Sequence, residues 1–213
     1  MINREEWLKA LHVKGESGDM LASQMDEAER LLMETAAPRK IFCLMQRADM
    51  RLSGVSIEKH LGGCDRVVVM AATLGIGVDN LIRRYQVRDM AMAVILDAGA
   101  SVYIEQVCDA FEAEIGDALN TGNDAQPMFM TSRFSPGYGD YPITEQKYIL
   151  SLVDASRRIG LTATADSLMV PRKSVSAVIG ISDHPVTGRL ATCSECVLRE
   201  KCLLRKEGKF CGK

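Results

Sequence analysis

The strongest structural signal in the sequence is a long helical pattern between residues 88 and 118. Apolar side chains recur there every three or four positions, as they do on one face of an α-helix; they are Leu96, Ala100, Ile104, Val107, Phe111 and Ile115. Beside this face, Asp97, Ser101 and Glu105 stand four residues apart and form a polar line along the same helix. The fold must therefore accommodate one long helix with an apolar face and an adjacent polar line.

The remaining segments predict a mixture of helices and strands. Residues 66–72 are a continuous apolar run of strand length, which suits a strand buried on both faces. Further strands are expected at 40–46, 49–57, 161–170 and 174–182, and further helices at 3–11, 19–36, 57–61, 77–85 and 144–155. Because helices and strands do not alternate steadily, we predict a single α+β domain with a twisted, largely antiparallel sheet and one long helix.

The composition changes near the C-terminus. After about residue 184 the sequence becomes polar and basic, and four of the seven cysteines follow within the last 21 residues. A chain of 213 residues fits one domain with a small appendage and can bury a core without disulfides. We therefore expect an α+β domain over residues 1–185 and a cysteine-rich, metal-binding tail over residues 186–213.

Charge and hydropathy argue against nucleic acids and membranes as partners. The formal net charge is −2, so no bulk positive field would draw the protein to nucleic acid or to an anionic membrane. The N-terminus is charged from Arg4 onward, unlike a signal peptide, and no run of about 18 apolar residues predicts a membrane-spanning helix. We therefore expect a cytoplasmic protein.

One irregular segment, Arg133–Pro142, carries residues suited to ligand binding. Pro136-Gly137 favours a type II turn, because glycine supplies the positive φ that such a turn requires. Arg133 offers a planar fork for a carboxylate or phosphate, and the segment's three aromatic rings could cover a flat ring. Together they could hold an amino acid joined to a nucleoside. The alternative is a purely structural loop, tied by an ion pair between Arg133 and Asp140.

The motif Arg133-x-Ser135-Pro136-Gly137-Tyr138, followed by Pro142, resembles a loop of the activation domain of cobalamin-dependent methionine synthase. The long helix with Asp97 and Glu105 is similar to the helix that precedes this loop in the family. Residues 162–176 are similar to the paired strands that follow it. The resemblance covers roughly residues 1–185 and is closest over 88–183.

The resemblance implies both a fold and a function. In this family the domain binds S-adenosylmethionine and docks on the cobalamin-binding domain of methionine synthase. Inactive cob(II)alamin is reduced by an electron from a flavodoxin-like or ferredoxin-like donor and is then methylated by S-adenosylmethionine. The chain is therefore expected to be a free-standing accessory subunit for reactivation. Whether it counts as an enzyme is open, because the cobalt that performs the transfer lies on another domain.

The same resemblance assigns residues to the S-adenosylmethionine site. It implies that Arg133 pairs with the carboxylate of the methionine moiety and that backbone groups of Ser135 and Gly137 contact the ligand. Tyr138 would help to shape the pocket. The family's helix carries a glutamate at the position of Ser101, and Glu105, one turn later, is the candidate for the ligand's ammonium group. The alternative for this polar line is a solvated or helix-stabilising stripe.

The tail supplies four thiolates with the spacing Cys193-x2-Cys196-x5-Cys202-x8-Cys211. Such a set can bind an iron–sulfur cluster of the 4Fe–4S type or structural zinc, and free thiols or another arrangement stay open. A cluster would suit the low-potential electron that corrinoid activation needs. The remaining cysteines (Cys43, Cys64 and Cys108) and the histidines (His12, His60 and His184) are expected to have packing or surface roles.

Two other functions remain compatible with the sequence. The chain could be an iron–sulfur electron-transfer activator of another corrinoid methyltransferase, without use of S-adenosylmethionine. It could also be a non-catalytic partner-binding module that keeps the fold and uses structural zinc for assembly. Iron in the anaerobically purified protein would favour the first, and zinc without iron would favour the second.

Overall fold

The computed structural model describes residues 1–13, 18–121 and 127–186. They form two compact units, each assembled from segments that are distant in the sequence. The first unit comprises Met1–Ile41, Ala71–Ala113 and Ala155–Val175, and the second comprises Phe42–Met70, Glu114–Asp154 and the chain from Ser176. The metal-binding tail predicted for residues 186–213 lies, apart from its first residue, outside the described residues.

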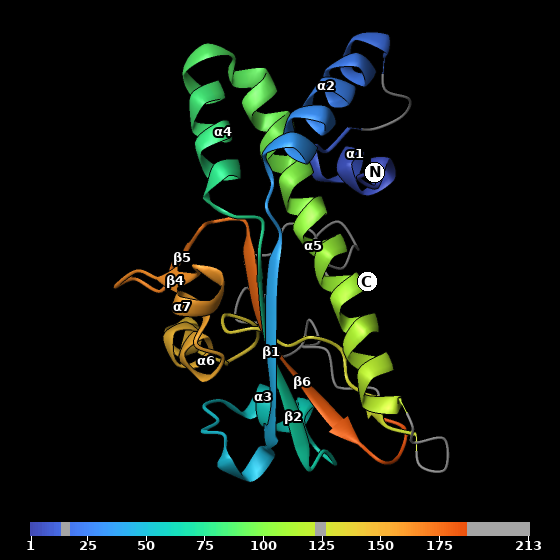
Figure 1. Ribbon diagram of the computed structural model, residues 1–213, viewed down its shortest axis with the longest axis vertical. Coiled ribbons are helices and arrows are strands. Elements are labelled where there is room, and N and C mark those ends of the chain that lie inside the picture. The colour runs from blue at the N-terminus through green and yellow to red at the C-terminus, as the bar shows by residue number, and fades with distance from the viewer. Residues whose placement is uncertain (14–17, 122–126, 187–213) are drawn as a thin grey trace. The chain divides into compact units, whose positions relative to one another are not determined.

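Helices dominate the first unit (Figure 1). They are α1 (Arg4–Ala10), α2 (Asp19–Thr35), α4 (Ile76–Arg88), α7 (Ala155–Ile159) and most of α5 (Met90–Asn120). The apolar stripe of α2 buries Met25, Ala28 and Leu32, which recur at helical spacing. The long helix α5 buries Leu96, Ala100 and Ile104 along the face that the sequence predicted.

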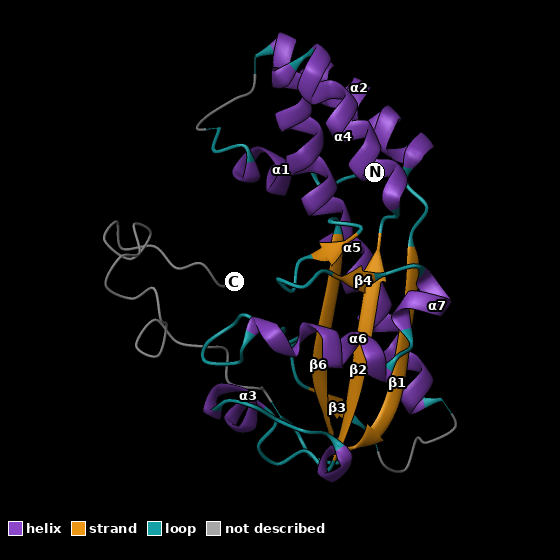
Figure 2. Cartoon of the chain, turned by 90° about the vertical axis from the view of Figure 1, so that its left-hand side faces the viewer, coloured by secondary structure: helices purple, strands orange, loops and turns teal. Residues whose placement is uncertain are grey.

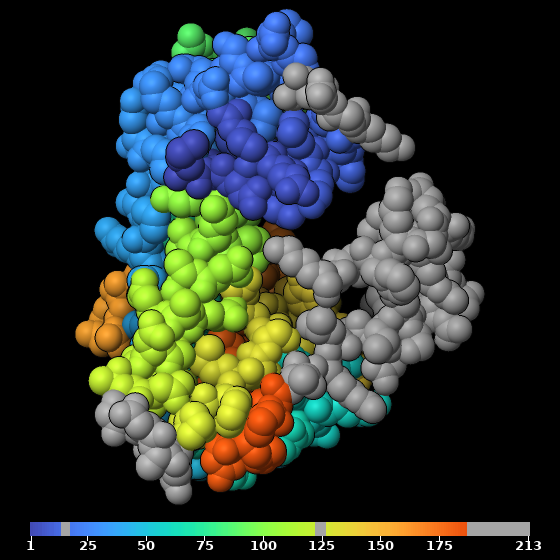
Figure 3. All heavy atoms as spheres, turned by 90° about the vertical axis from the view of Figure 1, so that its right-hand side faces the viewer, coloured from blue at the N-terminus to red at the C-terminus, as the bar shows by residue number. Residues whose placement is uncertain are grey.

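The side chain of Trp7 packs the N-terminal helix α1 against α5. Trp7 is fully buried and donates a hydrogen bond from Nε1 to the carbonyl oxygen of Ile95 at 3.0 Å. The ring lies directly against Gly99 of α5, where a Cβ atom would overlap it. The space-filling view shows the first residues of the chain lying on α5 (Figure 3). Gly99 is therefore required for this close approach between the two helices.

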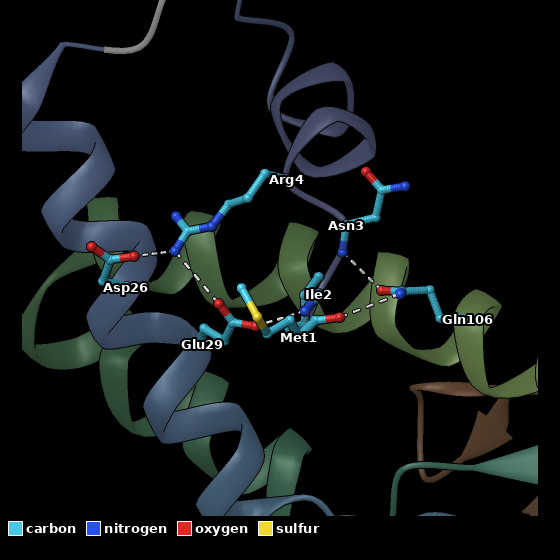
Figure 4. Close-up of polar contacts among 7 residues, drawn as sticks. All are labelled: Met1, Ile2, Asn3, Arg4, Asp26, Glu29 and Gln106. Carbon is cyan, nitrogen blue, oxygen red and sulfur yellow. Dashed lines mark hydrogen bonds and ion pairs between the residues drawn. The ribbon is translucent and has the colours of Figure 1, made fainter.

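Polar contacts hold the residues that precede α1 (Figure 4). The backbone N–H of Ile2 donates to Glu29 of α2, and that of Asn3 donates to Gln106 of α5 at 2.9 Å. Arg4 forms ion pairs with Asp26 and Glu29. These contacts join the start of the chain to both α2 and α5.

A four-stranded sheet has the order β1-β2-β6-β3 (Figure 2). Its strands are β1 (Arg39–Gln46), β2 (Arg66–Thr73), β6 (Ser174–Ser182) and β3 (Phe129–Met130). The last two are antiparallel, with Phe129 opposite Ser182. The interior strand β2 is buried from Val67 to Thr73, as its continuous apolar sequence predicted. β1, β2 and β6 each contribute residues to both units.

Short helices accompany the sheet in the second unit. They are η1 (Arg47–Asp49), α3 (Val55–His60), η2 (Ile143–Glu145) and α6 (Gln146–Leu152). Figure 2 shows α6 lying across one face of the sheet. Two contacts fix it there: Gln146 donates to the hydroxyl of Ser176 on β6, and the Cys43 thiol of β1 lies 3.7 Å from the carbonyl oxygen of Leu152.

The structure confirms the predicted combination of a long helix with an antiparallel sheet, and corrects three local assignments. Residues 49–57 do not form a strand, because the chain turns at Gly54 (φ +117°) and enters α3. Residues 161–170 form two short strands, β4 (Thr162–Ala163) and β5 (Met169–Val170), which pair with each other. The helix expected over 144–155 is interrupted at Asp154, whose φ is +51°.

α5 is the one helix in the described part of the chain that is long and apolar enough to cross a membrane, judged by length and composition alone. A core helix passes the same test. Met92, Ile95, Leu96, Ala100 and Ile104 are all buried in the structure, which accounts for much of its apolar composition.

Candidate functional site

The segment Ser135–Tyr138 forms the turn that the sequence predicted. The N–H of Tyr138 donates to the carbonyl oxygen of Ser135 at 3.2 Å, and Pro136 and Gly137 occupy the two central positions. Gly137 has φ +96°, which fits the third residue of a type II turn and is strained for any residue with a side chain. A second bond closes the loop, because the Gly137 N–H donates to the carbonyl oxygen of Tyr141 at 2.8 Å. A direct ligand contact from Gly137 would therefore use its carbonyl group.

The start of the loop is bonded to strand β6. Phe134 and Val178 exchange two backbone hydrogen bonds of 2.9 Å, which form an isolated antiparallel bridge. Thr131 and Gly180 also exchange two hydrogen bonds. The Thr131 N–H donates to the Gly180 carbonyl oxygen at 3.0 Å, and the Thr131 hydroxyl accepts from the Gly180 N–H at 2.8 Å. Four hydrogen bonds thus hold residues 131–134 on the sheet.

The bridge determines where the side chains around Phe134 point. Successive side chains of an extended segment alternate between its two faces. The Phe134 ring is only 4% exposed, so Arg133 and Ser135 project from the opposite face, and both are half-buried. The sequence-predicted residues Arg133, Ser135, Gly137 and Tyr138 therefore share one short, well-anchored loop in the second unit.

The three aromatic rings of the loop have different environments. Phe134 packs against the buried ring of His60, with centroids 4.8 Å apart, and against Tyr141 at 6.3 Å. Tyr141 is 1% exposed, whereas Tyr138 is 64% exposed. Of these three rings, Tyr138 is the one available to cover a bound ligand. His60 also contacts the carbonyl oxygen of Ser132 at 2.8 Å through Nε2, which confirms its predicted packing role.

The far end of the loop is held by Asp140. Its two carboxylate oxygens accept the backbone N–H groups of Val55 and Ser56, each at 2.8 Å, at the start of α3. These donors, chiefly those of Ser56, lower the pKa of Asp140 below its ordinary value. Gly54 lies so close that a Cβ atom there would come within 2.8 Å of the Asp140 carbonyl oxygen. The alternative interpretation of the sequence expected Asp140 to form an ion pair with Arg133. In the structure, Asp140 has a structural role because it accepts hydrogen bonds from the start of α3.

Two polar atoms beside the loop are buried without a hydrogen-bond partner in the described structure, the hydroxyl oxygens of Ser132 and Tyr141. Burial, together with the nearby charge of Glu145, raises the pKa of Tyr141. A buried hydroxyl that lacks a partner destabilises the folded protein. An ordered water enclosed beside these hydroxyls would remove that cost.

The polar line on α5 is partly structural. The ammonium group of Lys173 contacts the carboxylate of Asp97 at 2.9 Å and the hydroxyl of Ser101 at 2.8 Å. Lys173 is largely buried, so the Asp97 carboxylate compensates its charge and the Ser101 hydroxyl accepts one of its hydrogen bonds. Glu105 is exposed on α5 and belongs to the first unit, whereas the loop belongs to the second. The predicted contact of Glu105 with a ligand ammonium group stays a prediction.

Three of the seven cysteines lie within the described residues, and the four predicted metal ligands do not. Cys64 and Cys108 are buried and Cys43 is half-buried, which confirms their packing roles. Burial raises the pKa of the Cys43 and Cys64 thiols and keeps them protonated. Within residues 1–13, 18–121 and 127–186, no cluster of three or more metal-ligating side chains occurs. The predicted metal ligands Cys193, Cys196, Cys202 and Cys211 lie outside these ranges.

The sequence did not reveal most of the residues that hold the loop. His60, Gly54 and Gly180 are separated from their loop partners by 49 residues or more along the chain. The one local signal was the pair of glycines at 54 and 180, since glycine within apolar sequence often marks a close backbone approach.

Comparison with known proteins places this loop in a family. The family model described as "Vitamin B12 dependent methionine synthase, activation domain" matches residues 44–186, about two thirds of the chain and all of the loop. The chain belongs to this activation-domain family. The search of curated proteins gave no match.

The fold of this activation domain is also found in a solved structure. The crystal structure of the MetH reactivation domain bound to AdoHcy (S-adenosylhomocysteine) superposes with a TM-score of 0.66 at 15% sequence identity. The match covers 98% of the present chain and 82% of that chain. It confirms the predicted activation-domain fold.

Proposed function

We propose that this activation domain binds S-adenosylmethionine on the loop Arg133–Tyr141 and supports the reductive methylation of cob(II)alamin carried by a methionine synthase. Family membership supports the link to methionine synthase. The similar MetH reactivation domain was crystallised with AdoHcy, the product that S-adenosylmethionine leaves after methyl transfer.

The observation that carries this proposal is the anchored turn Ser135–Tyr138. A rigid loop binds a ligand with little loss of conformational entropy. The guanidinium of Arg133 can pair with a carboxylate through two parallel hydrogen bonds. Tyr138 provides an exposed ring that can cover a bound ligand. These groups suit a ligand with an amino-acid end and a flat nucleoside end.

The division of labour follows from the chemistry of the two participants. The cobalamin, held by the partner's cobalamin-binding domain, supplies the redox and nucleophilic chemistry, and a flavodoxin-like or ferredoxin-like protein supplies the electron. The present chain holds the methyl donor and orients its sulfonium methyl group. Docking on the cobalamin-binding domain brings the two reactants together, which removes much of the entropic cost of their encounter.

Calorimetric titration with S-adenosylmethionine tests the binding step. The wild type is expected to bind saturably. Arg133→Ala is expected to weaken binding about 10- to 100-fold, because a hydrogen-bonded pair of charges contributes about 1.5–3 kcal/mol. Arg133→Lys keeps the charge but loses the planar guanidinium, so its affinity should lie between those of the wild type and Arg133→Ala.

Arg84→Ala is the matched control. Arg84 is exposed on α4 in the first unit, and its removal changes the net charge by the same amount. It should bind S-adenosylmethionine like the wild type. Equal losses for Arg84→Ala and Arg133→Ala would show an effect of overall charge and would refute the assignment of Arg133.

A second candidate function rests on the four tail cysteines, Cys193, Cys196, Cys202 and Cys211. We propose that they bind a metal, with a 4Fe–4S cluster favoured over structural zinc. With a cluster and no binding of S-adenosylmethionine, the chain would be an electron-transfer activator of another corrinoid methyltransferase. With zinc and no such binding, it would be a partner-binding module. Iron and zinc analysis of the anaerobically purified protein, before and after Cys196→Ser, separates these cases.

A further inference from the structure

Arg133 lies between two peptide units that are both held in place. A peptide unit is planar, so the direction of a side chain depends on the two units that flank its Cα atom. The unit between Arg133 and Phe134 is held by the sheet, because the Phe134 N–H donates to the carbonyl oxygen of Val178 at 2.9 Å. The unit between Ser132 and Arg133 carries the Ser132 carbonyl oxygen, which lies 2.8 Å from Nε2 of His60. These two units therefore determine where the Arg133 side chain leaves the backbone.

The contact between His60 and the Ser132 carbonyl oxygen is a hydrogen bond with a fixed direction. A carbonyl oxygen only accepts, so Nε2 of His60 carries the hydrogen and donates it. The hydroxyl of Thr131 donates to the same carbonyl oxygen at 3.0 Å. His60 is 1% exposed, and its ring packs on Phe134 with centroids 4.8 Å apart. His60 thus contacts both the residue before Arg133 and the residue after it, and its burial leaves the imidazole little freedom to move.

His60 also links the loop to α3. It is the last residue of this helix, whose first N–H groups hold the other end of the loop at Asp140. The helix has six residues, so the two points of attachment are about 6–8 Å apart along its axis. Ser132 and Asp140, which enclose the turn Ser135–Tyr138, are therefore bonded to one short helix. The hydrogen bond from His60 couples the entry of the loop to the helix that holds its exit.

We infer that His60 is a positioning residue for the ligand site, and that it sets the direction of the Arg133 side chain toward the carboxylate of S-adenosylmethionine. This inference rests on the proposed function of the loop. Because His60 is buried, it acts through Arg133 and not through contact with the ligand. An arginine that is already positioned loses less conformational freedom on binding, which strengthens its bidentate pair with a carboxylate.

Calorimetric titration of the full chain with S-adenosylmethionine tests the inference with two variants of His60. His60→Phe keeps an aromatic ring against Phe134 and removes the donor, so it should weaken binding about 3- to 10-fold. His60→Gln keeps an N–H donor at a similar reach and should restore most of the affinity. Ile57→Val is the matched control, because Ile57 is fully buried on the same helix and its shortening destabilises the packing of α3 but removes no hydrogen bond. This control should bind S-adenosylmethionine like the wild type.

A double-mutant cycle with Arg133→Ala separates positioning from a general loss of structure. If His60 acts through Arg133, His60→Phe should weaken binding by less than about twofold once the guanidinium is gone. Weakening by the same factor in both backgrounds would show that His60 acts independently of Arg133 and would overturn the inference. Wild-type affinity in His60→Phe, or an equal loss in Ile57→Val, would overturn it as well.

Backbone dynamics provide a second measurement that needs no ligand. The ¹⁵N order parameter of the Arg133 amide should be about 0.85, the value of rigid backbone, in the wild type, in His60→Gln and in Ile57→Val, and it should fall in His60→Phe. An unchanged value in His60→Phe would contradict a positioning role. If the wild type binds no S-adenosylmethionine, the proposed function fails, and the order parameter still decides whether His60 fixes Arg133.

Discussion

Gly180 offers a direct test of how tightly the candidate loop Arg133–Tyr141 is bonded to the sheet. It lies in β6, and both its N–H and its carbonyl group bond to Thr131. A Cβ atom at this position would lie 2.5 Å from the Cys64 sulfur, and 3.1 Å from side-chain atoms of Leu61 and Thr131. Gly180→Ala therefore adds one methyl group to a site that has no room for it.

The cost can be worked from these contacts. Cys64 is only 2% exposed, so its sulfur lies among packed atoms on most sides. Overpacking of a filled core costs about 1–3 kcal/mol. Replacing glycine also reduces the entropy of the unfolded chain, which returns about 0.4–1 kcal/mol. We expect Gly180→Ala to lower the free energy of unfolding by about 1–2 kcal/mol, which corresponds to a fall in Tm of about 2–8 °C for a chain of this length.

A double-mutant cycle with Cys64→Ala identifies the cause. Cys64→Ala alone should destabilise moderately, because it leaves a small space. In that background the added methyl group occupies the space that the sulfur has left. Gly180→Ala should then cost much less, with a coupling of about 1–2 kcal/mol.

The assay is thermal and urea-induced unfolding followed by far-UV circular dichroism. Fluorescence would report the wrong unit, because Trp7 is the sole tryptophan and lies in the first unit. If Gly180→Ala costs the same in both backgrounds, to within about 0.5 kcal/mol, the contact between Gly180 and Cys64 does not limit the packing at this position.

Two further predictions concern other contacts. Gly99→Ala should destabilise by about 1–2 kcal/mol, because overpacking against Trp7 outweighs the better helix propensity of alanine, and it should shift tryptophan fluorescence to the red; an unchanged spectrum would contradict the packing described. Asp140→Asn should destabilise by about 1–2 kcal/mol at neutral pH through weaker bonds to the start of α3. The pKa of Asp140 is lowered in the folded protein, so its contribution is present above about pH 4 and is lost as pH falls through the lowered value. The difference between wild type and Asp140→Asn should therefore shrink on acidification, and a difference that does not depend on pH would exclude the charged contact.

Elements with strong periodicity could be predicted from the sequence. The long helix was expected at 88–118 and lies at Met90–Asn120, and the buried strand expected at 66–72 is Arg66–Thr73. The turn at Pro136-Gly137 was also predictable, because proline and glycine restrict the backbone locally. In each case the signal lies within the segment itself.

The misassigned segments depend on distant partners. Residues 49–57 alternate enough to resemble a strand, yet Asp140, 84 residues beyond Ser56, draws the backbone into the first turn of α3. Residues 161–170 turn back on themselves at Ser167, which has φ +65°. Such tertiary contacts override local propensity, and a single sequence does not display them.

The candidate site, like the fold, was predictable only where the signal lies within one segment. The loop residues Arg133 to Tyr138 were recognisable from a contiguous motif. The residues that hold the loop, namely His60, Gly180 and α3, were not. Lys173, which pairs with Asp97 and donates a hydrogen bond to Ser101, lies more than 70 residues from both. The polar line on α5 therefore gave no sign that two of its members have a structural partner.

We propose that this chain presents S-adenosylmethionine to a cobalamin on a partner domain. The most direct measurement mixes methyl-labelled S-adenosylmethionine with a methionine synthase cobalamin-binding domain and a reductant, and follows label on the cobalamin. Transfer that requires the present chain and falls at least about tenfold with Arg133→Ala, but not with Arg84→Ala, is the predicted result. Transfer at the same rate without the chain, or with Arg133→Ala in its place, would show that the chain does not present the methyl donor through Arg133.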